Sequence, residues 1–285
     1  MITNIPNITP ANHYWTTERL VTSLYTMLGD NIGGTIDTYT LRLWVNMGVI
    51  RAATFLRTFK PDYYSLRLEA VMTTANVGVN TLPYKIVNLK TPVTSQLVDA
   101  ERGEKAWPTT NGYSTFVPYQ FIDKVIAVHA QRGYLSQGVN LWNGTIQQLE
   151  LDKFSAISNN MNDQWRQDVV WAYEDGKVMI HVGAEVLTTP AAANWYTGNL
   201  VELSVLRKPI LDDLLPVDNN GLTNYGEAAD IPDEAVPLVL QYAKEFGFSI
   251  LGKQIDGNAL QATAMTEQSL LTAFGHAPTA QPATA

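Results

Sequence analysis

The feature that most constrains the fold is a helical apolar stripe near the C-terminus, within residues 230–256. Steps of three and four residues place side chains on one face of an α-helix, and such a face must be buried against a partner. Asp233 is expected to cap the start of this helix, with Glu234 in its first turn, although Pro237 can move that start by a few residues. Another short helix is predicted for residues 258–274. The stripe consists of Val236, Val239, Leu240, Ala243, Phe246, Phe248, Ile250 and Leu251.

The only comparably strong helical patterns lie at the other end of the chain. The first predicted helix begins at Thr16 or Thr17 and ends at Leu28, where Gly29 stops it. The second covers residues 37–59 and carries a long apolar side of its own. Because each of these helices needs a partner, the N-terminal pair and the C-terminal helix are expected to pack together.

Between the two helical ends the apolar residues alternate with polar ones, which is typical of β-strands. The clearest hairpin covers residues 169–182, where Asp175-Gly176 supports the positive backbone angles of a tight turn. Two similar proline-led apolar pieces occur, and the second leads into a predicted central strand at residues 123–130. The other predicted strands and pieces are residues 64–72, 82–87, 117–122 and 201–205.

The order of helices, strands and helices predicts an α+β fold. We expect a helical base formed by the N- and C-terminal helices, with a mainly antiparallel β module inserted into it. The predicted divisions are residues 1–62 for the N-terminal arm and helices, 63–210 for the β module, 211–229 for a linker, 230–275 for the C-terminal helices and 276–285 for a flexible tail.

The composition restricts the function classes. The chain has 285 residues, 46% of them hydrophobic, which is enough for one large core or two modest ones. It has no cysteine, and no signal peptide or membrane-spanning run is evident. The net charge of −8 argues against a surface that grips nucleic acid. Residues 209–285 hold ten acidic and two basic side chains, which indicates a solvated acidic face or a surface that meets a basic partner or passing DNA.

The sequence contains no recognisable motif for catalysis, metal binding or phosphate binding. The four histidines are dispersed, and His129 and His181 lie in predicted strands, where a half-exposed structural role is the simpler interpretation. The glycines of residues 29–34 form no phosphate-binding motif. A calcium loop laid on residues 216–227 fails because its first ligand would be Pro216. We therefore predict no catalytic residue, no cofactor and no metal site, and a protein that is not an enzyme.

Aromatic residues are numerous, and some of them are candidates for a partner interface. Trp44 and Trp171 fit the periodicity of a buried core. The other candidates lie near arms or loops, where an amphipathic aromatic side chain often anchors a subunit contact, although ordinary packing explains them equally well. These interface candidates are Trp15, Trp107, Trp142, Trp195 and Tyr196.

Three stretches resemble neck proteins of tailed bacteriophages, the adaptor or ring components that lie below the portal. Residues 43–50, Leu-Trp-Val-Asn-Met-Gly-Val-Ile, resemble their early helix. Residues 117–128, Val-Pro-Tyr-Gln-Phe-Ile-Asp-Lys-Val-Ile-Ala-Val, are similar to a proline-led strand of podophage virion proteins, with the 173–182 hairpin following in order. Residues 231–243, Ile-Pro-Asp-Glu-Ala-Val-Pro-Leu-Val-Leu-Gln-Tyr-Ala, resemble the closing helix. The likeness covers roughly residues 37–256 and is nearest to short-tailed or crAss-like phages.

This resemblance implies a structural virion protein, assembled in the cytoplasm of the host bacterium. It implies a ring, commonly of twelve copies, whose partners are its own copies, the portal and other neck or tail proteins, with no membrane. Double-stranded DNA would pass through without sequence-specific binding, and acidic side chains would keep it from sticking. The alternatives are another tail, baseplate or capsid-associated protein, or a carbohydrate-binding or glycan-hydrolysing module that uses Trp107, Trp142 and Trp195 with Asp163 or Asp175.

Overall fold

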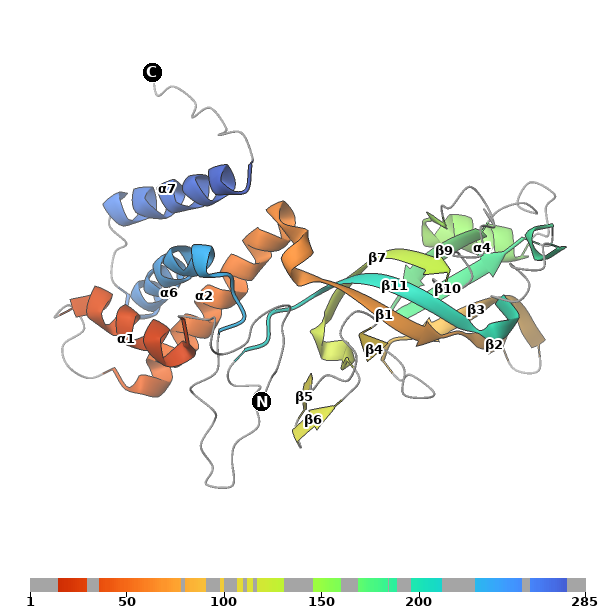
Figure 1. Ribbon diagram of the computed structural model, residues 1–285, viewed down its shortest axis with the longest axis horizontal. Helices are drawn as coiled ribbons and strands as arrows, with labels where there is room; N and C mark the ends of the chain where they lie inside the picture. Colours follow the sequence, from red (N-terminus) through yellow and green to blue (C-terminus); the bar gives the residue numbers. More distant parts are fainter. Residues whose placement is uncertain are drawn as a thin grey trace, which may run out of the picture. The chain divides into compact units, whose positions relative to one another are not determined.

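The computed structural model describes most of the chain, which divides into two compact units (Figure 1). The helical unit comprises Met1–Tyr64, Pro108–Tyr113 and Lys208–Ala285, and the β unit comprises Ser65–Trp107 and Ser114–Arg207. The described residues are 15–29, 36–77, 80–90, 98–99, 107–109, 112–114, 117–130, 146–159, 169–183, 185–188, 196–211, 229–252 and 257–275.

Helices from both ends of the chain build the helical unit. Thr16 caps the first helix by accepting the N–H of Arg19 at 3.3 Å, and Asp37 caps the second by accepting the N–H of Thr40 at 2.6 Å. Both predicted N-terminal helices are thereby confirmed. The elements are α1 (Thr17–Leu28), α2 (Thr38–Phe59), η2 (Pro61–Tyr64), η7 (Asp233–Ala235), α6 (Val236–Ile250) and α7 (Gly257–Ala273).

Two glycines allow α2 and α6 to approach closely. A Cβ on Gly48 would lie 2.5 Å from the carbonyl oxygen of Val239, and a Cβ on Gly247 would lie 2.4 Å from Cε3 of Trp44. These contacts run in opposite directions along the chain, so the two helices are antiparallel. The indole of Trp44 is buried in the resulting core, as its periodicity predicts, and the core also takes side chains from α1 and Leu270 of α7.

The start of the C-terminal helix differs from the prediction. Asp233 lies in the 3₁₀ turn η7 and does not cap α6, which begins at Val236 with Pro237 in its first turn. Pro237 can take that place because the first helical amides have no partner within the helix. Asp230 is buried instead, where its Oδ2 accepts the N–H of Ile210 at 2.7 Å and its carbonyl accepts the hydroxyl of Tyr64 at 3.0 Å.

A four-stranded antiparallel sheet begins and ends the β unit. Its order is β4-β1-β11-β7, so the first long strand, β1, pairs with the last, β11, from Ser65↔Leu206 to Val71↔Leu200. The predicted central strand is β7, which lies at the edge of this order among the described strands; that prediction is wrong because β11, not β7, has partners on both sides. The strands are β1 (Ser65–Val71), β4 (Val98–Asp99), β7 (Ile122–Ala130) and β11 (Leu200–Arg207).

A five-stranded sheet in the order β2-β3-β10-β9-β8 completes the β unit. The predicted hairpin is confirmed, with Trp171 opposite Ile180 and positive φ angles of 44° at Asp175 and 80° at Gly176. The helix α4 (Leu151–Asn159) packs on this sheet through the buried ring of Phe154. The strands are β2 (Thr73–Val77), β3 (Asn80–Asn88), β8 (Gln147–Gln148), β9 (Val169–Glu174) and β10 (Lys177–Val182).

The observed helices and antiparallel sheets confirm the α+β class, but several details differ from the sequence reading. The proline-led pieces are not equivalent, because residues 82–87 lie in β3 whereas residues 117–122 form the 3₁₀ turn η3 (Tyr119–Phe121) before β7. The units change at Tyr64/Ser65 and Arg207/Lys208. Residues 212–228 and 276–285, the parts read as linker and tail, lie outside the described residues. The smaller elements are β5 (Trp107–Thr109), β6 (Gly112–Ser114) and η5 (Val186–Thr188).

Candidate interaction surfaces

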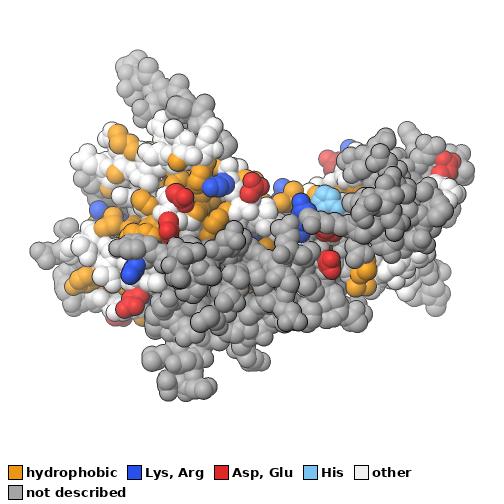
Figure 2. Space-filling model, in the orientation of Figure 1, with side chains coloured by type: hydrophobic (Ala, Val, Ile, Leu, Met, Phe, Trp, Pro, Cys, Tyr) orange, Lys and Arg blue, Asp and Glu red, His pale blue; other side chains and the backbone are white. Residues whose placement is uncertain are grey.

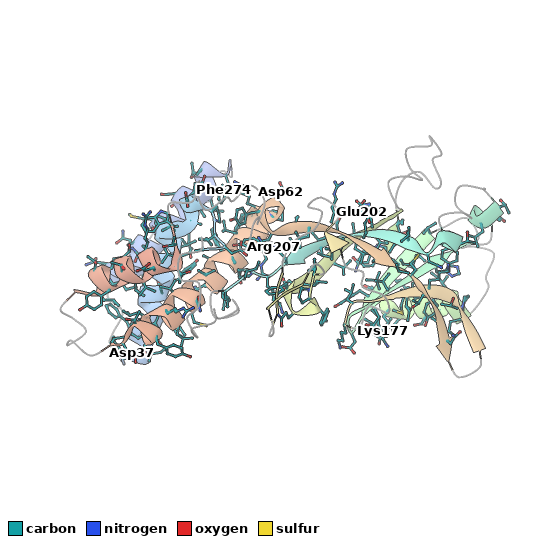
Figure 3. All side chains as sticks on the ribbon, turned by 60° about the horizontal axis from the view of Figure 1, so that its bottom comes forward. Asp37, Asp62, Lys177, Glu202, Arg207 and Phe274 are labelled. Atoms are coloured by element: carbon teal, nitrogen blue, oxygen red, sulfur yellow. The ribbon has the colours of Figure 1, made fainter. Side chains whose placement is uncertain are left out.

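Six large apolar side chains are exposed at one end of the helical unit, which we call the apolar end. The contact of Trp44 with Gly247 places the start of α2 beside the end of α6, and residues 30–37 connect the end of α1 to the same place. Asp37, labelled in Figure 3, marks this end, and Figure 2 shows hydrophobic side chains open to solvent over the unit. The apolar end consists of Tyr25, Met27, Tyr39, Leu43, Ile250 and Leu251.

Tyr39 and Leu43 lie off the stripe that α2 buries. Ile250 and Leu251 belong to the stripe predicted to be buried, but α6 ends at Ile250 and both side chains are exposed, so that part of the prediction is wrong. Tyr39 is 74% exposed, although α2 buries Leu41 and Trp44 beside it. Single exposed apolar side chains are ordinary on soluble proteins, whereas several gathered on one end mark an interaction surface. The sequence signal was Tyr39 and Leu43 themselves, since they are apolar residues outside the apolar side of a predicted helix.

The second surface lies where α7 rests on α6 and α2. We call Arg51, Tyr242 and Glu245 the α7 seat. The Thr263 hydroxyl of α7 donates to Oε1 of Glu245 at 2.5 Å, while Arg51 donates to Oε2 of the same carboxylate at 2.7 Å. The Tyr242 hydroxyl donates to Glu267 of α7.

The charged and polar side chains of the α7 seat interact with one another. Arg51 is 57% exposed and lies 4.0 Å from the ring centroid of Tyr242, where a guanidinium gains cation–π attraction. Burial, followed by the hydrogen bond to Glu267, raises the pKa of Tyr242 well above its usual range. The phenol therefore remains protonated and remains a donor to α7 at neutral pH.

Little apolar surface holds α7 in place. Among its seventeen residues only Thr263 and Leu270 are buried, and burial of one leucine is worth about 1.5–3 kcal/mol. A hollow of about 330 Å³ separates Met265 and Ala273 from Pro237, at the start of α6. Phe274, directly after α7, packs partly buried against the helical core, with the Lys60 ammonium 4.4 Å from its ring centroid. The attachment of α7 therefore combines polar contacts with the apolar contacts of Leu270 and Phe274.

No family model matches the chain, and no curated protein matches it. Its function therefore has to be inferred from its own residues.

Across the described ranges, no three histidine, cysteine or acidic side chains are grouped as a metal site. None of the helices in that part of the chain has the length and apolarity needed to cross a membrane.

Of the sequence-predicted interface residues, Trp15 lies in the helical unit. It packs partly buried against the helical core, and its carbonyl accepts the N–H of Ala229 at 3.2 Å. Its side chain also lines an open hollow of about 460 Å³ beside Glu18 and Arg19 of α1. Ordinary packing therefore accounts for part of this indole, and the hollow leaves another part accessible.

Tyr196 lies in the β unit, where Lys85 contacts it. The Lys85 ammonium lies 4.2 Å from the ring centroid and donates to the Tyr196 carbonyl and to Asn199 Oδ1. Burial raises the pKa of Tyr196 to about 12 and lowers the pKa of Lys85. The structure thus gives Tyr196 an internal role in positioning the start of β11. The side chains of Trp107, Trp142 and Trp195 lie outside the described residues.

The acids considered for glycan hydrolysis do not form a described pair. Asp175 lies on the hairpin turn, where its hydrogen bond to Lys90 lowers its pKa. A general acid in this chemistry needs a raised pKa, so Asp175 is poorly suited to that role. Asp163 lies outside the described residues.

Part of the C-terminal acidity serves the interior of the helical unit. Asp230 and Glu245 are buried with hydrogen-bond donors, and Glu267 accepts from Tyr242. Asp233 and Glu234 are exposed, and the other acids of residues 209–285 lie outside the described residues. The prediction of a solvated acidic face is therefore wrong for Asp230 and Glu245, because both side chains are buried.

Proposed function

We propose that this protein is a structural component of a bacteriophage virion, a neck or connector ring between the portal and the tail that surrounds the DNA passage. The observation that carries the proposal is the apolar end of the helical unit. Its six exposed apolar side chains lie on the ends of three packed helices, which is typical of a contact surface, and a ring provides a partner surface to every copy.

The likeness to neck proteins determines which assembly we infer. The closing-helix likeness falls on α6, and the early-helix likeness falls on α2, the two helices whose ends form most of the apolar end. In such a ring the helical unit would contact the portal or neighbouring copies. The exposed Asp233 and Glu234 would add to the repulsion between the ring and passing phosphates.

The proposal predicts that the apolar end is required for assembly. Replacing Tyr39 and Leu43 together by serine removes two exposed apolar side chains and no buried ones, so the fold should persist. We expect incorporation into virions of the phage that encodes the protein to fall at least about tenfold, because interface anchors carry most of the binding energy. Ile126→Ser is the matched control, since Ile126 is exposed on the β unit.

A reconstruction of the same virions tests the location directly. We expect density for the helical unit in a ring against the portal. If the protein is absent from the neck, or if Ile126→Ser impairs incorporation as strongly as the double variant, the connector role is wrong. Density elsewhere in the tail or capsid would favour the alternative of another structural virion protein.

A further inference from the structure

We propose that α7 is exchanged between copies, so that the α7 of one copy occupies the α7 seat of its neighbour. The partner surface is Arg51, Tyr242 and Glu245, and the partner is a second copy of this chain. The inference rests on the proposed function, because a ring supplies the neighbour.

The observation that motivates exchange is how α7 is held. Its contacts with the α7 seat are hydrogen bonds from Thr263 to Glu245 and from Tyr242 to Glu267. Polar contacts of this kind can be replaced by water while α7 is detached, whereas a buried apolar face cannot. The apolar cost of detachment falls on Leu270 and on Phe274, which directly follows α7 and packs partly buried against the helical core.

The chemistry of α7 suits it to meeting another copy. Glu267 is its only charged residue, and this carboxylate is engaged by Tyr242. Two apolar side chains of α7 are exposed: Leu260, which is 51% exposed, and Met265, which is 58% exposed. A chain with a net charge of −8 repels its copies over much of its surface, but α7 brings no unpaired charge to the contact.

The seat already fits this occupant, because the same chemistry holds α7 within one chain. Exchange of an identical element between copies preserves these contacts and needs no new complementary surface. When each copy gives its α7 to the next, the contact is heterologous, which closes a ring if the rotation per copy allows it. Six residues, 251–256, separate α6 from α7, so the exchanged helix reaches at most roughly 20 Å from its own α6.

The absence of cysteine from the natural chain allows a direct crosslinking test. Tyr242 faces Glu267 and Glu245 faces Thr263, so the antiparallel register continues to Ser249 beside Leu260. Both residues are exposed, and cysteine at either position should leave the fold intact. The experiment mixes Ser249→Cys chains with Leu260→Cys chains, lets them exchange over a range of concentrations, and adds a short bis-maleimide.

We expect a covalent dimer between the two variants at a yield about tenfold above that of a control mixture of Thr54→Cys with Leu260→Cys, because occupancy of the seat raises the local concentration. Thr54 is exposed on α2. A second arm crosslinks the Ser249→Cys, Leu260→Cys double variant within one chain before assembly. This locked protein should lose ring formation, whereas the double variant without crosslinker should retain it.

Exchange is overturned if the mixture gives no more dimer than the control while the double variant crosslinks within one chain, or if the locked protein forms rings normally. These outcomes concern the purified chain and its rings. They are distinct from failure of the connector role, which would appear as absence of the protein from the virion neck.

Discussion

The helical unit and the β unit differ in what they expose. Of the ten large apolar side chains exposed among the described residues, eight belong to the helical unit. The other two, Ile126 and Tyr173, lie in the described part of the β unit, and the Tyr173 hydroxyl lies 3.5 Å from that of Tyr119. Among the described residues, large exposed apolar side chains are thus concentrated on the helical unit, which is the unit that the proposed assembly places in contact with a partner.

Both units are closed by contacts between residues distant in sequence, β1 with β11 and α2 with α6, but the β unit also contains local hairpins. In the β unit, β9 and β10 are joined by a two-residue turn. In the helical unit, α2 packs on α6, and Arg51 pairs with Glu245 across 194 residues of sequence. Because contacts between distant residues cost more loop-closure entropy, the helical unit should form later than the β hairpins.

The largest expected effect comes from emptying the core of the β unit. Phe154 is buried, and its ring centroid lies 5.3 Å from that of Tyr84 in an edge-on contact. Phe154→Ala should lower the free energy of unfolding by about 3–5 kcal/mol, because the ring leaves a cavity against β9 and β10. Hydrogen exchange should then accelerate in β9, β10 and α4 peptides while α2 and α6 peptides keep their protection.

The matched control is Ile126→Ala, an exposed position whose loss should change stability by less than about 1 kcal/mol. If Phe154→Ala accelerates exchange equally in the helical unit, the two units unfold as one. The helical unit and the β unit would then not be independently stable.

The long helices and the β9–β10 hairpin could be predicted from the sequence, because each is determined by one apolar stripe or one turn. The caps Thr16 and Asp37 and the Asp175-Gly176 turn identify their elements by local chemistry alone. α4 was missed because its nine residues are short and embedded among strand patterns. The edge position of β7 was missed because strand order depends on distant pairing with β11, which periodicity does not encode.

The second prediction tests the close approach that defines the helical unit. Gly48→Val places new atoms against the Val239 carbonyl and Ala243, so α2 and α6 must separate. We expect a loss of up to about 3 kcal/mol, the usual upper range for overpacking, with faster exchange in α2 and α6 only.

Gly257→Ala is the control for the second prediction. A Cβ there meets nothing within 4 Å, so stability should stay constant or rise slightly. Equal destabilisation by both substitutions would show that the loss does not arise from the α2–α6 contact.

The candidate surfaces were less accessible to sequence reasoning than the fold. Periodicity identifies the residues that a helix buries, but it does not tell whether a residue off the stripe, such as Leu43, is covered by another segment. The α7 seat depends on Glu245, a charged residue that the sequence places off the apolar stripe and that the structure buries. Hydrogen bonds from Arg51 and Thr263 offset the cost of burying the Glu245 carboxylate. These partners are distant in sequence, so no local sequence pattern predicts them.

The third prediction concerns the attachment of α7. Tyr242→Phe removes the hydroxyl that donates to Glu267 and keeps the ring under Arg51. Stability should fall by about 1 kcal/mol, and hydrogen exchange should accelerate in α7 before any other helix. Tyr25→Phe at the apolar end provides the control and should have no effect, because Tyr25 is exposed. Unchanged exchange in α7 would mean that this hydrogen bond contributes nothing to the seat.

The smallest expected effect is a pH dependence confined to the β unit. Both described histidines lie there, with His181 Nδ1 3.1 Å from the Pro83 carbonyl and His129 Nε2 3.1 Å from Ser204 Oγ, and burial lowers the pKa of each. In the unfolded chain a histidine takes up its proton near pH 6.5, whereas in the folded β unit protonation is delayed to lower pH. The stabilisation is therefore complete above about pH 6.5 and declines as the pH falls below that value toward the folded pKa.

Urea unfolding of the β unit at a series of pH values, followed by the exchange of β10 peptides, measures this decline. His181→Gln should flatten it in part, since glutamine can donate to the Pro83 carbonyl without titrating. His129 should account for the remainder, moderated by Glu202, which favours its charged form. If α2 and α6 peptides lose protection over the same pH range, the dependence arises outside these two histidines, and the distinction between the units does not extend to pH.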